Sequence, residues 1–130
     1  MQRLTMMMLS ALAVTTLSST LAAQTTPAVP TGVQVNNGVF TDAKGMALYT
    51  YDRDTVANKS LCNAQCSKNW PALTATATDK DVGDWTVITR DDGSKAWAYK
   101  GKPLYYFAQD KAAGDKAGDG RGNVWHLAKP

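Results

Sequence analysis

Three side chains in this chain of 130 residues could bind a soft metal ion or carry redox chemistry. Cys62 and Cys66 are the only cysteines, and His126 is the only histidine. Two thiolates and an imidazole suit Cu(I), and the thioether of Met46 could supply a fourth soft ligand. The cysteines could instead form a disulfide, because Cα atoms at positions i and i+4 of a helix lie about 6 Å apart. The spacing of Cys62 and Cys66 is therefore compatible with both a metal site and a disulfide.

The N-terminal residues indicate an oxidising compartment. Residues 1–23 contain Arg3 near the start, a long apolar stretch, and the small residues Ala22 and Ala23 at the end. This order is typical of a secretory signal peptide. We expect cleavage after Ala22 or Ala23 and a soluble periplasmic or secreted product. Exported proteins commonly pair their cysteines, so the location favours a structural Cys62–Cys66 disulfide without a cofactor.

Charge and composition limit the classes of partner. The formal net charge is +3 for the whole chain, and one unit less once Arg3 is removed. This is too small to predict a nucleic-acid partner. No second long apolar stretch follows the signal, so we expect no membrane span in the mature chain. All 11 acidic residues are Asp, which favours turns and caps over helix interiors.

The remaining chain predicts one small, mainly β domain. Residues 24–32 are rich in Thr, Ala and Pro and predict an extended linker, which leaves a domain over residues 33–130. Turn-forming residues divide short β-branched and aromatic runs, a pattern typical of antiparallel hairpins. We expect strands near residues 33–35, 39–41, 46–51, 85–89, 96–99, 103–107 and 124–127.

One segment predicts a helix. Residues 58–70 carry Ser60 as a possible N-cap, followed by Cys62, Cys66 and Asn69 at helical spacing, and Pro71 would end the helix.

An internal repeat is the strongest feature of the sequence. A Gly-x-x-Leu-Tyr-x-aromatic-x-x-Asp motif occurs twice, with an offset of 56 residues, and a Trp follows each copy after a loop. The copies are too short to fold alone, so they should pack as a pseudo-twofold pair around one core. The motif positions are Gly45, Leu48, Tyr49, Tyr51, Asp54 and Trp70 in the first copy, and Gly101, Leu104, Tyr105, Phe107, Asp110 and Trp125 in the second.

Strand geometry assigns roles to these positions. Because side chains alternate along a strand, the Leu of each copy should face one side and its two aromatic residues the other. Asp54 and Asp110 fall just after the strands, where a carboxylate can accept hydrogen bonds from backbone N–H groups of the following loop. The motif is therefore interpreted as a device that holds the fold.

The motif resembles a bacterial family of secreted repeats, often described as predicted lipoproteins with the pattern Tyr-x-(Phe/Trp/Tyr)-x-x-Asp. The resemblance covers roughly residues 33–129 and includes Cys62, Cys66, Trp70 and the stretch from Trp97 to Tyr105. It implies a cell-envelope location and a β-rich domain, with no assigned activity. Many members carry a lipidation Cys, which this chain lacks at the signal cleavage site.

Three other functional hypotheses are a Ca²⁺ site, an enzyme and an aromatic binding platform, and the sequence favours none of them. The Gly- and Asp-rich loop at residues 110–123 could wrap Ca²⁺, but basic residues among its acids oppose a dication. The motifs of serine hydrolases, zinc proteases and phosphate loops are absent, so we do not expect an enzyme. The aromatic residues could form a binding platform, although a domain of this size would use them as its core.

Taken together, the sequence predicts an exported protein of unknown activity, non-enzymatic, acting as a structural or interaction module with an unidentified envelope partner. The alternative is a periplasmic redox or copper-handling protein that uses Cys62, Cys66 and His126.

Overall fold

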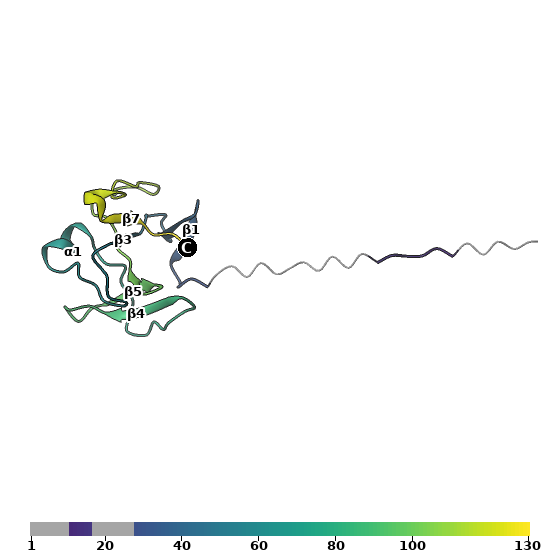
Figure 1. Cartoon of the computed structure of the whole chain (residues 1–130), viewed down its shortest axis with the longest axis horizontal. Helices are drawn as coiled ribbons and strands as arrows, with labels where there is room; N and C mark the ends of the chain where they lie inside the picture. The colour runs from purple at the N-terminus through teal and green to yellow at the C-terminus, as the bar shows by residue number, and fades with distance from the viewer. Residues whose placement is uncertain (1–10, 17–27) are drawn as a thin grey trace, which may run out of the picture.

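Short antiparallel strands form three small sheets in the structure. It is a computed structural model that describes residues 11–16 and 28–130, so most of the predicted signal peptide, including its cleavage site, lies outside the described residues. The elements are β1 (Val33–Asn36), β2 (Val39–Asp42), β3 (Tyr49–Tyr51), α1 (Gln65–Asn69), β4 (Trp85–Thr89), β5 (Lys95–Tyr99), β6 (Lys102–Pro103), the 3-10 turn η1 (Arg121–Asn123) and β7 (Trp125–Leu127). The mainly β fold class is therefore confirmed (Figure 1).

Two of the predicted hairpins are present. β1 pairs with β2 through the turn at Asn37 and Gly38, which both have positive φ angles as a tight two-residue hairpin turn requires. β4 pairs with β5 through a turn in which Asp92 accepts hydrogen bonds from the backbone and hydroxyl groups of Ser94. β6 extends this second hairpin into a three-stranded sheet.

The third sheet joins the two copies of the repeat. β3, from the first copy, pairs with β7, the last strand of the second copy. The second copy also pairs with the first outside this sheet, because Tyr105 forms an antiparallel bridge with Ala72. At the centre, the backbone groups of Tyr49 and Tyr105 exchange two hydrogen bonds of 2.8 and 2.9 Å. Each copy therefore completes its pairing with residues from the other.

The side chains of the motif divide between two hydrophobic clusters, as the strand alternation predicts. Leu48 and Leu104 are fully buried in one cluster with Phe40, Trp85 and Trp97. The other cluster contains the motif aromatics, both trailing Trp residues and the first cysteine: Tyr49, Tyr105, Phe107, Trp70, Trp125 and Cys62.

The helix prediction for residues 58–70 is wrong in its extent, since only Gln65–Asn69 is helical. Ser60 is not the N-cap: its hydroxyl lies 2.7 Å from the hydroxyl of buried Tyr105. Ala64 precedes the helix with φ of 51°, outside the right-handed region. Tertiary hydrogen bonds therefore hold residues 58–63 in an irregular path, and these bonds outweigh the weak helical preference of the segment.

The segment that leads into the domain, at residues 28–32, lies close to the C-terminus (Figure 1). Pro30 is buried and accepts a hydrogen bond from Val33, while Val29 packs against the Leu-containing cluster. Figure 1 places the C-terminus beside β1. Among the described residues, no helix has the length and apolar character needed to cross a membrane.

Candidate functional site

Crossed hydrogen bonds connect the tyrosine of each copy to the aspartate of the other. The Tyr49 hydroxyl donates to Oδ2 of Asp110 at 2.6 Å, and the Tyr105 hydroxyl donates to Oδ2 of Asp54 at 2.5 Å. Both carboxylates are less than a tenth exposed. Hydrogen bonds to a charged acceptor in such a dry environment are strong, and losing one partner is costly.

The second oxygen of each carboxylate holds the loop that follows it. Asp54 Oδ1 accepts from the backbone N–H of Leu61 at 2.7 Å, and Asp110 Oδ1 accepts from that of Ala117 at 2.9 Å. In both copies the donor lies seven residues after the aspartate. Asp54 and Asp110 therefore each accept a backbone hydrogen bond from the loop that follows them.

Burial controls the ionisation of this network. It raises the pKa of the Asp54 carboxyl, while the hydrogen bonds from Tyr105 and Leu61 and the charge of Arg90 act in the opposite direction. It also raises the pKa of the Tyr49 and Tyr105 hydroxyls, and the neighbouring aspartates add to the effect. The phenols thus stay protonated, as donors must, over the whole physiological range.

Four aromatic rings form a continuous stack between the copies. Phe107 stacks on Trp70, Trp70 stacks on Trp125 with ring centroids 3.7 Å apart, and Trp125 stacks on Tyr51. Trp70 and Trp125, at the centre of the stack, come from different copies, and so do Phe107 and Tyr51 at its two ends. Because the ring faces cover one another and the Trp side chains are less than a tenth exposed, these residues serve as core, as their number in so small a domain suggests.

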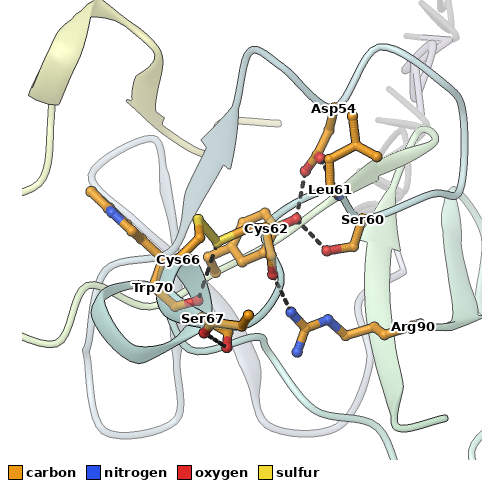
Figure 2. Close-up of a disulfide and its surroundings, with 10 residues drawn as sticks. Asp54, Ser60, Leu61, Cys62, Cys66, Ser67, Trp70 and Arg90 are labelled. Carbon is orange, nitrogen blue, oxygen red and sulfur yellow. Dashed lines mark hydrogen bonds between the residues drawn. A yellow bond between two sulfur atoms is a disulfide. The ribbon is translucent and has the colours of Figure 1, made fainter. Parts of the chain in front are cut away.

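Cys62 and Cys66 are joined in a disulfide, with sulfur atoms 2.06 Å apart (Figure 2). Cys62 is fully buried in the aromatic cluster, and Cys66 packs against its edge. The guanidinium of buried Arg90 donates to the carbonyl oxygen of Cys62 at 2.5 Å. The disulfide thus lies in the same loop that Asp54 anchors through Leu61.

The structure does not gather the candidate copper ligands. Within residues 11–16 and 28–130, no three His, Cys or Asp side chains form a group that could hold a metal ion. The sulfurs are bonded to each other, and Nε2 of His126 lies 2.7 Å from Oδ2 of exposed Asp52. Met46 contributes its backbone N–H to a hydrogen bond with Asp42. The two cysteines therefore form the disulfide that their spacing and the predicted export favour.

The carboxylates of the Gly- and Asp-rich loop are likewise engaged with backbone groups. Asp115 accepts from the N–H groups of Lys111 and Ala112, and Asp119 accepts from that of Leu127. These bonds shape a turn and hold it against β7, so both carboxylates act as acceptors for backbone N–H groups.

The first copy has a cysteine where the second has a glycine at the corresponding position. Cys62 lies eight residues after Asp54, and Gly118 lies eight residues after Asp110. A Cβ atom on Gly118 would come within 2.8 Å of the Trp70 ring and 3.0 Å of Phe107. The first copy therefore places a sulfur in the aromatic cluster, whereas the second requires the absence of a side chain.

Comparison with known families agrees with this duplicated architecture. Residues 33–74 and 86–129 each match a family described as a secreted repeat of unknown function. The chain belongs to this secreted-repeat family. No curated protein and no solved structure matches the chain significantly. Family membership thus supports secretion and an internal repeat, and it assigns no catalytic activity.

Sequence reasoning missed the partners of the motif residues. It predicted the acceptor role of the aspartates within their own copies, and it missed the tyrosine donors from the opposite copies. It also missed Arg90, whose burial and contact with Cys62 depend on tertiary packing. The recurrence of Tyr and Asp at one fixed offset was the signal that could have suggested a reciprocal pairing.

The crossed bonds predict a specific energetic coupling in a secreted-repeat domain. Tyr49→Phe should lower the free energy of unfolding by about 1–3 kcal/mol, because it removes the donor to Oδ2 of the buried Asp110 carboxylate. In urea unfolding, Tyr49→Phe and Asp110→Ala should be non-additive by more than about 0.5 kcal/mol. The control pair Tyr49→Phe and Asp54→Ala, which share no hydrogen bond, should couple less. Additivity of the first pair would contradict the assignment.

The buried phenols also predict the response to alkaline pH. Tyr49, Tyr105 and Tyr106 have pKa values above their ordinary value of 10.0 because burial disfavours the phenolate. The unfolded chain therefore releases these protons first, so stability is fully present below about pH 10 and is lost as the pH rises further. Urea unfolding at stepped pH should show this decline, with a shallower slope for Tyr106→Phe. Complete phenolate formation with native near-UV circular dichroism would contradict the prediction.

Proposed function

We propose that the chain is an exported, non-catalytic interaction module of the cell envelope. The observation that carries the proposal is the mutual satisfaction of the motif residues: the tyrosines, aspartates and cysteines that could perform chemistry bond to one another inside the core. Catalytic groups must reach a substrate, and these do not. Membership of a family described as a secreted repeat supports the exported location.

The proposal includes the processing of the N-terminus. Residues 1–23 act as a signal peptide that is removed after Ala22 or Ala23, residues 24–32 lead into the domain, and residues 33–130 form the secreted-repeat domain. The support comes from the Arg3 charge, the apolar stretch and the small residues at its end. The product works as a soluble protein in the periplasm or outside the cell.

Intact mass spectrometry of the exported protein tests this part. Expression of the whole chain in a bacterial host should yield an extracytoplasmic protein that begins at Ala23 or Gln24 and lacks two hydrogens relative to the dithiol. Leu12→Arg interrupts the apolar stretch, so this control should accumulate in the cytoplasm at full length. Recovery of the unprocessed wild-type chain in the membrane would instead show an N-terminal anchor.

A second measurement separates binding from catalysis. Amide resonances of the mature protein should shift when a heat-treated envelope extract is added and return after dialysis, while the composition of the extract stays constant. Protein-dependent consumption of any component over time would show an enzyme and contradict the proposal. Unchanged resonances would contradict the interaction role.

A further inference from the structure

Two adjoining hollows lie beside the point where the chain enters and leaves the domain. The larger has a volume of about 500 Å³, within the range of pockets that bind small molecules. The smaller has a volume of about 380 Å³. Tyr99 and Pro130 line both, so the two hollows adjoin, and together they are called the groove below.

The larger hollow is apolar. Phe40, Trp85 and Tyr99 pack together, with ring centroids 4.7 to 5.0 Å apart, and all three line it. Phe40 and Trp85 are only 2% and 1% exposed, so Tyr99 is the ring with accessible surface in the hollow. Val29 and Val35 contribute aliphatic walls, and Val35 is 48% exposed. Such a surface gains free energy when a hydrocarbon chain displaces water from it.

The smaller hollow is basic. Lys100, Lys102 and Lys129 line it, and none of them has a carboxylate within 4.0 Å in the described part of the chain. The ammonium group of Lys100 lies 5.3 Å from the centre of the Tyr99 ring, at the wall that both hollows share.

The acidic groups at the groove are few. Among the residues that line the two hollows, the one acidic side chain is the exposed carboxylate of Asp84, which lies at the apolar hollow. Nearby Asp52 is engaged with His126 at 2.7 Å. Three cations with no carboxylate in contact therefore give the basic end an excess of positive charge, which favours an anionic group.

We propose that this groove binds a single-chain anionic amphiphile, such as a fatty acid, with its tail in the apolar hollow and its carboxylate among the three lysines. The inference rests on the proposed function and names the ligand class of the interaction module. A sugar would find few hydrogen-bonding side chains in the apolar hollow. A bilayer would need apolar groups that project outward, whereas these rings lie in a concavity.

Titration calorimetry with dodecanoate below its critical micelle concentration tests the inference. The probe is added to the disulfide-bonded mature protein, residues 24–130. One molecule should bind per chain, and the cationic amphiphile undecyltrimethylammonium, with an alkyl tail of equal length, should bind at least about tenfold more weakly. Equal affinity for the two head groups would overturn the role of the lysines.

Matched variants locate the site. Val35→Asp should weaken dodecanoate binding at least about tenfold, because it places a charge at the apolar wall. Val56→Asp is the control, since Val56 is 56% exposed and lies outside the groove. The triple variant Lys100→Gln, Lys102→Gln, Lys129→Gln should weaken binding, and the triple control Lys44→Gln, Lys68→Gln, Lys80→Gln should not. Equal losses in the variants and their controls would overturn the location.

Two further outcomes would identify a different occupant, and a third would overturn the ligand class. Sedimentation with anionic phospholipid vesicles but no binding of monomeric dodecanoate would show a membrane surface instead. Binding only after removal of residues 24–27 would show that this segment fills the groove. Resonance shifts with envelope extract, but none with dodecanoate, would overturn the ligand class and leave the proposed interaction function standing.

Discussion

The crossed tyrosine–aspartate hydrogen bonds are the constraint on which the rest of the molecule depends. Each carboxylate is buried, so it must be satisfied on both oxygens, and the partners come from different copies. One oxygen fixes the position of the opposite tyrosine in the core. The other fixes the following loop, which in the first copy carries the disulfide and in the second carries Gly118 against Trp70. Packing between the copies and the course of both loops therefore depend on the same two groups.

This arrangement makes the domain cooperative despite its short strands. β3 and β7 contain three residues each, too few for an isolated pair to be stable in water. The two crossed hydrogen bonds also join distant residues: Tyr49 and Asp110 lie 61 residues apart, and Tyr105 and Asp54 lie 51 apart. Because neither copy can satisfy both oxygens of its own aspartate, partial folding gains little, and folding must wait for the closure of long loops.

Local physical rules predicted the parts of the structure that depend on nearby residues. The turn at Asn37 and Gly38 gave the first hairpin, and strand alternation gave the separate faces of Leu48 and Tyr49. The rules failed where distant groups competed with local preference. Ser60 was expected to cap a helix, but its hydroxyl contacts Tyr105, and the helix begins only at Gln65. The groove was also missed, since its walls come from both hairpins and both ends of the domain.

The stacked Trp70 and Trp125 rings have an optical consequence. Their planes are 4° apart and their centroids 3.7 Å apart, so the electronic transitions of the two indoles interact strongly. One indole belongs to each copy, and their fixed, chiral surroundings turn that interaction into a circular dichroism signal. The signal exists only while the copies are docked. The domain thus carries a built-in spectroscopic reporter of the contact between its halves, which requires no attached dye.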